Sequence, residues 1–316
     1  MNKILTISIA AYNVEKYIES VLDSLVVPSI MDKLEVMIVN DGSTDDTIQK
    51  CQKYVDEYPQ TFFLINKENG GWGSTVNEGI KRASGKYFKL LDGDDYFANL
   101  ESFIDVLEKN EADLVYTPYV VFYEDSDETE RHALNSSLEF DKVLDIKSDF
   151  FGKEFAMHSC AFKTELLKNI KITEHCFYTD IEYILKGIEN VKTVYFSDID
   201  VYYYRLGRTG QSASIEGYRK HSDEHIKVLL KLLKRYKKLD STSEIYSIFR
   251  NRLGGMVDLE YSILLHLLPS KKNAHTMKRF DDIIKENYPE FYKSTRKRVQ
   301  VFRKIGVLSY PFIIYR

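Results

Sequence analysis

Three carboxylates stand together at the end of an apolar run, and they constrain what this chain can fold into. Residues 87–91 have the composition of a buried strand, and Asp92-Gly93-Asp94-Asp95 follows them directly. Carboxylates packed this closely repel one another, so an isolated fold gains nothing from the arrangement. A hard divalent cation reverses that balance, because it prefers carboxylate and phosphate oxygens as ligands. The cluster therefore predicts a Mg²⁺ or Mn²⁺ site at a strand end, with a diphosphate as a further ligand.

A second acidic turn follows another apolar run. Residues 34–39 are typical of a buried strand, and the polar residues 40–47 are typical of a turn that leads into a helix. Asp41 therefore lies just past the carboxyl end of a strand, which is the edge where ligands bind in open α/β sheets. Asp41-Gly42 alone is also what a plain turn requires. Together, two acidic strand ends on one edge can hold the two ends of a nucleotide.

Strand and helix patterns alternate through the first hundred residues. Strand-like runs occur at residues 5–10, 35–39, 62–65 and 87–91. Between the first two, apolar residues recur at helical spacing behind Asn13, which is a suitable N-cap. This alternation predicts an α/β fold with a mostly parallel sheet covered by helices. The later chain differs, since residues 225–236 and 249–268 favour helices. We expect a first domain at 1–215 and a helical C-terminal region at 216–316.

Composition limits the partners and the compartment. The chain has 316 residues, 44% hydrophobic and 29% charged, as in ordinary soluble globular proteins. Its formal net charge of −4 gives no reason to expect a nucleic acid partner. The three cysteines lack Cys-x-x-Cys spacing, and neither a zinc motif nor a secretory signal is evident. No apolar run reaches the length of a transmembrane helix. We therefore expect a cytoplasmic protein.

Four motifs, in order, resemble the bacterial glycosyltransferases of the large inverting family 2, which have the GT-A fold. The motifs are residues 8–18, 39–47, 69–79 and 92–95, and the resemblance spans roughly residues 4–215. It implies a GT-A nucleotide-diphospho-sugar transferase fold and a metal-dependent inverting enzyme of the hexosyltransferase type. The implied cofactor is Mn²⁺ or Mg²⁺, and the implied donor is a nucleotide sugar, with a UDP-sugar as our expectation.

The resemblance also implies roles for individual residues. Asp92 and Asp94 match the DXD pair, with Asp94 as the direct metal ligand and Asp92 near the ribose or the metal. Asp180 corresponds to the catalytic base, and Asp41 to the residue that binds the nucleotide base. The apolar spacing after Asp180 separately predicts a helix that starts there and runs to about residue 187. The residues expected to contact the nucleotide sugar are Ala11, Tyr12, Asn13, Asp41, Asn69, Gly71, Asn77, Asp92, Gly93, Arg205 and Arg208.

Three positions depart from the family pattern. Ala10 stands where the first motif usually has proline, and Val76 stands where an arginine is common. Arg205 or Arg208 can supply the missing charge to the diphosphate. Thr179 replaces the usual glutamate before Asp180. These departures keep open an alternative, in which the chain is a catalytically impaired nucleotide-sugar-binding or scaffolding subunit of a glycosyltransferase complex. A phosphotransferase that uses Asp92 and Asp94 is disfavoured, because it would need that pair after the first strand.

The end of the chain allows two interpretations. Residues 293–316 contain seven Lys or Arg and no acid, interleaved with apolar side chains. Such a segment can lie on an anionic membrane surface, which would place the protein peripherally at the inner face of the cell membrane. It can equally be a helix that packs its apolar face on the protein. The acceptor would be a saccharide or a lipid-linked saccharide, in the synthesis of cell-surface polysaccharide, glycolipid or teichoic-acid-like polymer.

Overall fold

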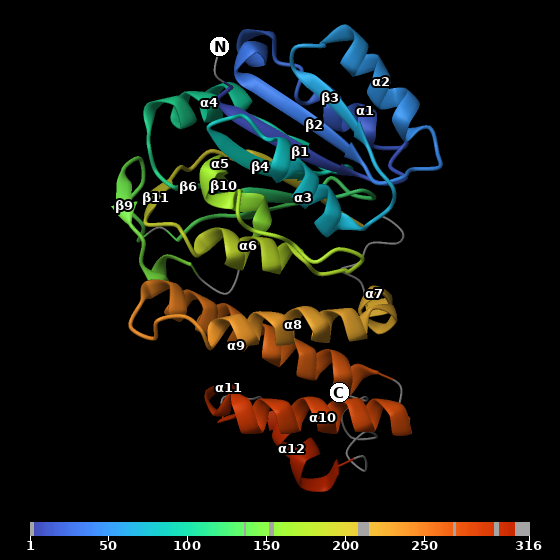
Figure 1. The fold of residues 1–316 in the computed structure, drawn as a ribbon, viewed down its shortest axis with the longest axis vertical. Coiled ribbons are helices and arrows are strands. Elements are labelled where there is room, and N and C mark those ends of the chain that lie inside the picture. Colours follow the sequence, from blue (N-terminus) through green and yellow to red (C-terminus); the bar gives the residue numbers. More distant parts are fainter. Residues whose placement is uncertain are drawn as a thin grey trace. The chain divides into compact units, whose positions relative to one another are not determined.

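Strand β1 (Leu5–Ala11) is the centre of the main sheet and is buried along almost all of its length. It pairs in parallel with β2 (Leu34–Asn40) and β4 (Tyr87–Asp92), and β3 (Phe62–Asn66) extends the sheet beyond β2 (Figure 1). A parallel strand covered on both faces is nearly continuously apolar, as these runs are. This computed structural model describes residues 3–135, 137–151, 155–207, 215–267, 270–293 and 297–306.

The other half of the sheet is mixed. The full order is β3-β2-β1-β4-β10-β6-β11-β9. The added strands are β6 (Leu114–Tyr116), β9 (Val143–Asp145), β10 (Cys160–Lys163) and β11 (Thr193–Phe196). Strand β10 runs antiparallel to both β4 and β6, whereas β11 is parallel to β6. The predicted α/β fold with a largely parallel sheet is thus confirmed.

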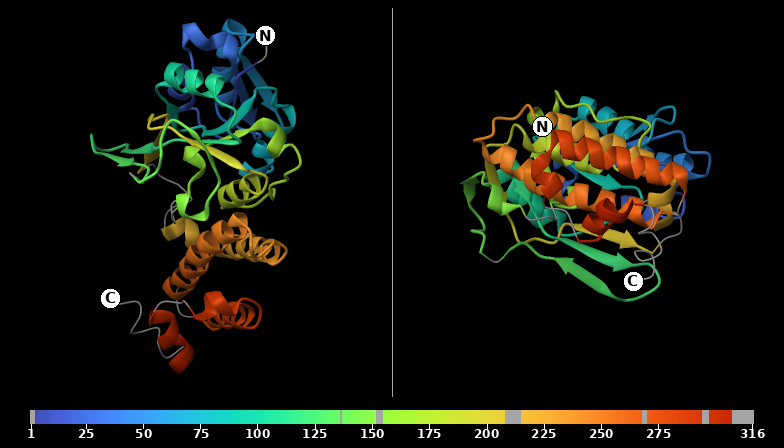
Figure 2. Two further views of the ribbon diagram at one scale, coloured as in Figure 1. Left: turned by 90° about the vertical axis from the view of Figure 1, so that its left-hand side faces the viewer. Right: turned by 90° about the horizontal axis from the view of Figure 1, so that it is seen from below.

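A second, smaller sheet has the order β5-β12-β7-β8. Its strands are β5 (Tyr96–Phe97), β7 (Tyr119–Tyr123), β8 (Thr129–His132) and β12 (Tyr202–Leu206). Strands β7 and β8 form an antiparallel hairpin that extends away from the main sheet, as the green ribbon in Figure 2 shows. Strand β12 pairs with β5 directly after the acidic cluster, so this sheet brings distant residues to that cluster.

The helices of the first part connect the strands of the main sheet. They are α1 (Ile18–Asp23), α2 (Thr47–Glu57), α3 (Trp72–Arg82), α4 (Leu100–Lys109), α5 (Thr164–Leu167) and α6 (Asp180–Ile188). The 3-10 turns are η1 (Pro28–Lys33), η2 (Ser148–Phe150) and η3 (Met157–Ser159). The predicted N-cap at Asn13 is wrong, because α1 begins after Tyr17. Asn13 instead has a φ of +52° and accepts a hydrogen bond from the Thr44 N–H, so it serves the turn.

The chain divides into two compact units, one of Met1–Phe150 with Glu154–Gln211 and one of Phe151–Lys153 with Ser212–Arg316. The helices of the second unit are α7 (Ile215–Lys220), α8 (Ser222–Tyr236), α9 (Glu244–His266), α10 (Lys271–Asn287), α11 (Pro289–Lys293) and α12 (Lys297–Ile305). The predicted C-terminal helical region is therefore confirmed. Within the described ranges, none of the helices combines the length and the apolar character that crossing a bilayer requires.

Helix α12 packs onto its own unit. Val299 and Phe302 are buried, and the Arg303 guanidinium donates hydrogen bonds to an Asp281 carboxylate oxygen at 2.8 Å and to the Tyr261 hydroxyl at 3.1 Å. Packing of part of the basic C-terminal segment is thus observed. Residues 307–316, which belong to the same predicted segment, lie outside the described residues.

Glycine at position 79 lets α3 approach β1. A Cβ built there would lie 2.1 Å from the Ser8 Oγ and 2.9 Å from its Cβ, closer than atoms can pack. Gly79→Ala should therefore lower the free energy of unfolding by about 1–3 kcal/mol, as overpacking does. In contrast, a Cβ at Gly255 in α9 meets no atom within 4 Å. Gly255→Ala should stabilise α9 by up to about 1 kcal/mol through helix propensity. Urea denaturation measures the free energy of unfolding of both variants. Equal changes in Gly79→Ala and Gly255→Ala would contradict the close approach of α3 to β1.

Candidate active site

The two acidic turns lie on either side of the end of β1. In the register of the sheet, Ala10 pairs with Asp92 of β4 and Ala11 pairs with Asn40 of β2. The Asp41 N–H continues this pairing by donating to the Ala11 carbonyl at 2.9 Å. All three strands are parallel, so their carboxyl ends share one edge. The expected meeting of the two turns at a single edge is therefore observed.

Asp41 anchors the loop that precedes α3. Its carboxylate is 3% exposed and accepts hydrogen bonds from the Gly70 N–H at 2.9 Å and the Gly71 N–H at 2.8 Å. The Lys67 ammonium lies 2.6 Å from the same carboxylate, and the Asn69 amide donates to the Asp41 carbonyl at 3.0 Å. Two backbone donors and one cation satisfy a buried carboxylate well. Asp41, Asn69 and Gly71 thus form one connected unit.

Tyr12 and Asn13 follow β1 at this edge. Tyr12 is 51% exposed, which is unusual for a large aromatic residue that directly follows a buried strand. The Asn13 N–H donates to the Ser43 Oγ at 3.1 Å, and its side-chain oxygen accepts from the Thr44 N–H at 2.8 Å. The first and second motifs are therefore fastened together, and the Tyr12 ring remains open to solvent beside them.

The acidic cluster is stabilised by donors from two elements, α3 and β12. The Trp72 indole N–H of α3 donates to Asp92 Oδ1 at 2.8 Å. Asp95 is 1% exposed and accepts from the Tyr202 hydroxyl at 2.6 Å and from the Arg205 N–H at 2.8 Å. Burial, followed by the charges of Asp92 and Asp94, raises the pKa of Asp95 well above its usual range. The carboxylates thus remain mutually repulsive despite these donors.

Gly93 allows the cluster to approach β1. Its N–H donates to the Ala10 carbonyl at 3.1 Å, and a Cβ built at this position would lie 2.8 Å from that same oxygen. Any larger residue would push the acids away from the strand end. The glycine between Asp92 and Asp94 is thus required by a close backbone approach.

His158 completes a group of possible metal ligands with two of the acids. One ligand atom each from Asp92, Asp95 and His158 lie within 4.8 Å of one another. The His158 Nδ1 is buried and has no hydrogen-bond partner among the residues that the structure describes. Burial lowers the pKa of His158 to about 3, so the imidazole is neutral, the form that binds metals. Two carboxylates and a neutral imidazole suit Mn²⁺ better than Mg²⁺, which prefers oxygen ligands alone.

The metal ligands expected from the sequence overlap only partly with this group. Asp92 belongs to this group, whereas Asp94 does not. Asp94 is nevertheless only 7% exposed and directly follows Gly93. The side chain of Arg205 lies near Asp94, since the Arg205 Nε donates to the Asp94 carbonyl at 2.8 Å. Its guanidinium also lies 4.7 Å from the centre of the Phe122 ring. Arg208, the other expected arginine, lies outside the described residues.

A lysine is buried beneath the site. Lys89, in the middle of β4, has no exposed surface, and its ammonium donates to the His158 carbonyl at 2.6 Å and to the Cys160 carbonyl at 3.4 Å. The ammonium also lies 5.8 Å from the centre of the Tyr202 ring. Burial lowers its pKa to about 7. Lys89 therefore links β4 to the η3 segment that carries His158 and to the tyrosine that holds Asp95.

Asp180 begins α6, as predicted. Its side chain is exposed, and Thr179 occupies the N-cap position, so Asp180 is the first helical residue and not the cap. The half-buried Tyr204 relates this residue to the acidic cluster. Burial raises the pKa of Tyr204, and four carboxylates add to the effect, in decreasing order Asp92, Asp95, Asp94 and Asp180. The charges of Asp180 and of the acidic cluster therefore all raise the pKa of the same Tyr204 hydroxyl.

Asn77 fastens the segment before α6 to α3. Its side-chain oxygen accepts from the Ile172 N–H at 2.8 Å, and its amide donates to the Ile172 carbonyl and to Glu174 Oε1, both at 2.9 Å. Glu182, one turn into α6, is fully buried, accepts from the Thr173 N–H and pairs with a lysine. The carboxylate of Glu182 is thus held by contacts inside the protein, unlike the exposed carboxylate of Asp180.

Sequence reasoning missed several of these side chains. Trp72, Lys89, His158 and Tyr202 were not among the residues predicted for the site, and Asp95 was predicted only as a member of the acidic cluster. Two signals were available, a single tryptophan within the third motif and a lysine inside a strand that is otherwise apolar. His158 and Tyr202 gave no such signal, because they reach the cluster from η3 and β12, far along the chain.

The buried position of Lys89 predicts a pH dependence of stability. Above pH about 7 the folded lysine is largely neutral, whereas the unfolded lysine keeps its proton up to about 10.5. The unfolded state then binds more protons, so the free energy of unfolding rises with pH, by up to about 1.4 kcal/mol per pH unit. Wild type should therefore gain stability relative to Lys89→Met between pH about 7 and about 9. Urea denaturation measures this gap.

A surface lysine provides the control. Lys53 is exposed on α2, so the gap between wild type and Lys53→Met should not change over the same pH range. Parallel stability curves for wild type and Lys89→Met would mean that Lys89 stays protonated in the folded protein.

Comparison with known proteins agrees with this geometry. The chain matches the family model "Glycosyl transferase family 2" over residues 6–170. It is 31% identical over 211 residues to the minor teichoic acid biosynthesis protein GgaB of Bacillus subtilis (strain 168), covering 64% of this chain and 23% of that protein. It is 28% identical over 240 residues to the uncharacterized glycosyltransferase EpsJ of the same strain, covering 72% and 67%. The chain spans only about a quarter to a third of the first curated relatives it matches.

Solved structures share the fold. Staphylococcus aureus TarS 1–349, in complex with UDP-GlcNAc, matches with a TM-score of 0.72 at 18% identity, covering 98% of this chain and 90% of that one. The mannosyltransferase PcManGT from Pyrobaculum calidifontis, in complex with GDP-Man and Mn²⁺, matches with a TM-score of 0.56 at 15% identity, covering 99% and 88%. The GT-A-like fold expected from the motifs is confirmed, and the chain belongs to Glycosyl transferase family 2.

Proposed function

We propose that the first unit is a metal-dependent glycosyltransferase domain that moves a sugar from a nucleotide-sugar donor to an acceptor hydroxyl, with inversion at the anomeric carbon. The observation that carries this proposal is the acidic cluster at the carboxyl end of β4, beside the end of β1, where Asp92, Asp95 and His158 bring one possible metal-ligand atom each to within 4.8 Å of one another. A single displacement requires a site for the departing diphosphate and a base for the acceptor hydroxyl. Membership in the family supports both requirements.

The open ring of Tyr12 and the neighbouring Asn13 form the proposed nucleoside site. Asp41 completes it, because its Oδ2 accepts one described hydrogen bond, from Gly71, and a carboxylate oxygen has a second acceptor position for a base N–H. The further contacts that we propose for the nucleotide sugar are Ala11, Asn69, Gly71, Asn77, Asp92 and Gly93, with Arg205 and Arg208 near the diphosphate.

The proposed metal site contains Asp92 and Asp94, with Asp95 and His158 as further ligands. Burial, followed by the charges of Asp92 and Asp94, raises the pKa of Asp95, and a cation would relieve the repulsion among these carboxylates. A bound Mn²⁺ or Mg²⁺ would stabilise the negative charge that develops on the diphosphate. Trp72 orients Asp92 for this task through its indole N–H, and Tyr202 orients Asp95. The chain's own role at this site is thus to hold repelling carboxylates in a fixed arrangement.

Asp180 is the proposed catalytic base. Its side chain is exposed and lies in the first turn of α6, where an acceptor hydroxyl can reach it from solvent. In the proposed step, Asp180 takes the proton of the acceptor hydroxyl. The hydroxyl oxygen at the same time bonds to the anomeric carbon, and the bond between that carbon and the diphosphate breaks. One displacement of this kind inverts the anomeric configuration.

The donor and pathway are proposed by analogy. TarS was solved with UDP-GlcNAc and UDP, so a UDP-sugar is the donor that we propose here. GgaB is named for teichoic acid biosynthesis. We therefore propose an acceptor that is a saccharide or a lipid-linked saccharide, in the synthesis of cell-surface polysaccharide, glycolipid or teichoic-acid-like polymer.

The metal proposal predicts the behaviour of one substitution. Asp94→Asn should lose Mn²⁺-dependent UDP binding, because it removes a charged ligand position. The fold should persist, and the apoprotein should be as stable as wild type or slightly more stable, because like-charge repulsion falls. Calorimetry with UDP, with and without Mn²⁺, measures the first effect, and thermal unfolding measures the second. Wild-type UDP binding by Asp94→Asn in the presence of Mn²⁺ would contradict the metal assignment.

The base proposal predicts a kinetic loss. Asp180→Asn should reduce kcat for UDP release by about 10²-fold or more, whereas donor binding should change little. Glu174→Gln provides a matched control, since this nearby carboxylate is exposed and accepts a hydrogen bond from Asn77. Near-normal kcat in Asp180→Asn together with a large loss of kcat in Glu174→Gln would mean that Glu174, and not Asp180, is the base. Donor binding by wild type without any UDP release would instead favour the scaffolding alternative.

A further inference from the structure

The two units differ sharply in charge. Residues 212–316 contain 22 Lys and Arg against 11 Asp and Glu, whereas residues 1–211 contain 22 against 37. The formal net charge of −4 for the whole chain therefore hides a net charge of +11 on residues 212–316, which make up almost all of the second unit. Such a division of charge within one chain points to an anionic partner for the basic part.

Part of this charge is organised along α8. Lys227, Lys231 and Lys234 follow one another at spacings of four and three residues, so they share one helix face, and all three are exposed. The opposite face of α8 is buried, with Val228 and Leu232 among its residues. The lysine row is therefore held on an ordered helix and presented to solvent.

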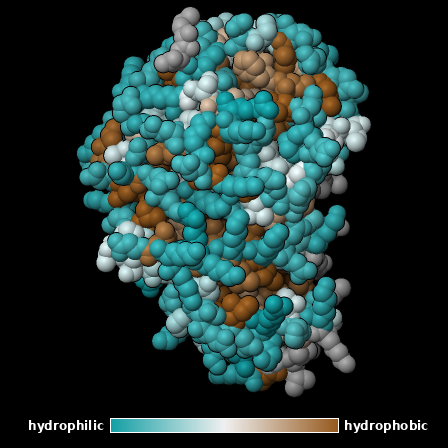
Figure 3. Space-filling view, viewed as in Figure 1, coloured by the Kyte–Doolittle hydropathy of each residue, from teal (hydrophilic) through white to brown (hydrophobic). Residues whose placement is uncertain are grey.

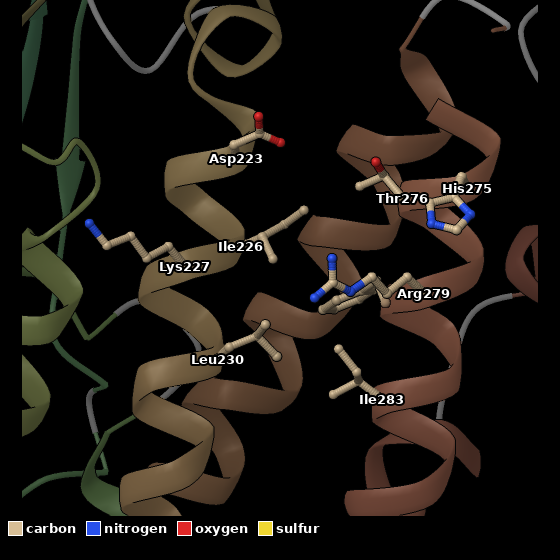
Figure 4. A pocket seen from close by; sticks show the side chains of 9 residues that line it. Asp223, Ile226, Lys227, Leu230, His275, Thr276, Arg279 and Ile283 are labelled. Atoms are coloured by element: carbon tan, nitrogen blue, oxygen red, sulfur yellow. The ribbon is translucent and has the colours of Figure 1, made fainter. Parts of the chain in front are cut away.

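A groove of about 280 Å³ lies between α8 and α10. Figure 4 shows Ile226 and Leu230 of α8 and Arg279 and Ile283 of α10 pointing toward one another across it. Its other lining residues are Asp223, Lys227, His275, Thr276 and Phe280. On the face drawn in Figure 3, brown apolar atoms accordingly lie among hydrophilic ones over these helices. The groove thus combines apolar walls with cationic side chains.

The exposed face of α12 has the same composition. Lys297, Val301, Lys304 and Ile305 recur at helical spacing and are exposed, whereas Val299 and Phe302 are buried beneath them. Val301 is 42% exposed and Ile305 is 45% exposed. Two exposed aliphatic side chains among the lysines gain nothing from water, so this basic face is not explained by solvation alone.

We propose that the second unit docks on an anionic lipid bilayer through the α8–α10 groove and the exposed face of α12. The cations would pair with lipid phosphates, and the aliphatic side chains would enter the boundary between headgroups and acyl chains. A soluble polyanion would satisfy the cations alone and would gain nothing from Val301 and Ile305. Charge and apolar surface together therefore favour a membrane.

Vesicle sedimentation of the full chain tests this proposal. The protein should bind vesicles of phosphatidylcholine mixed with phosphatidylglycerol and should bind phosphatidylcholine alone much less, with binding that weakens as salt rises. The variant Lys227→Gln/Lys231→Gln/Arg279→Gln should bind about 100-fold more weakly, because each basic residue at an anionic surface contributes a factor of about five. The variant Val301→Ser/Ile305→Ser should also bind more weakly.

Matched variants and a soluble competitor decide the outcome. Lys53→Gln/Lys81→Gln/Lys109→Gln removes the same charge from exposed lysines of the first unit and should leave vesicle binding unchanged. The proposal is overturned if both triple variants lose binding equally, or if inorganic polyphosphate binds while the anionic vesicles do not. Unchanged vesicle binding by Lys227→Gln/Lys231→Gln/Arg279→Gln would overturn the groove as the docking surface. None of these measurements depends on transferase activity, so the proposed function can fail separately.

Discussion

The parallel pairing of β1 between β2 and β4 is the constraint on which the rest of the site depends. Because the three strands run in the same direction, Asp41 and Asp92 emerge beside the same strand end. An antiparallel neighbour would place one of these acids at the opposite edge of the sheet. The positions of the Asp41 loop and of the acidic cluster, together with the exposed Tyr12, follow from this pairing.

The acidic cluster is held together against its own repulsion. Trp72, Tyr202 and the backbone of Arg205 each donate to one of its carboxylates, yet the pKa of Asp95 remains raised. These donors come from a helix and from a strand of the second sheet, so the cluster depends on the tertiary fold. A site of this kind has unfavourable electrostatics when empty, and that is the condition under which a cation gains most by binding.

The buried Lys89 is the least expected part of this arrangement. Its side-chain nitrogen donates to the carbonyls of His158 and Cys160. The lysine therefore acts on the position of the η3 segment, and His158 with it. Replacing Lys89 by an apolar residue would leave a buried carbonyl without its donor, which is costly in an interior.

The sequence by itself determined the four strands β1 to β4, the edge at which the acids lie and the family, because these follow from local apolar runs and from turns adjacent to them. It also predicted α6 beginning at Asp180 and the C-terminal helices. It misplaced the start of α1, since Asn13 hydrogen-bonds with the second motif and not with the helix. Only the tertiary structure decided that Trp72, Tyr202 and His158 surround the acids and that Asn77 fastens the segment before α6. These contacts join residues that are distant along the chain, and no local pattern encodes a contact whose two partners lie on different elements.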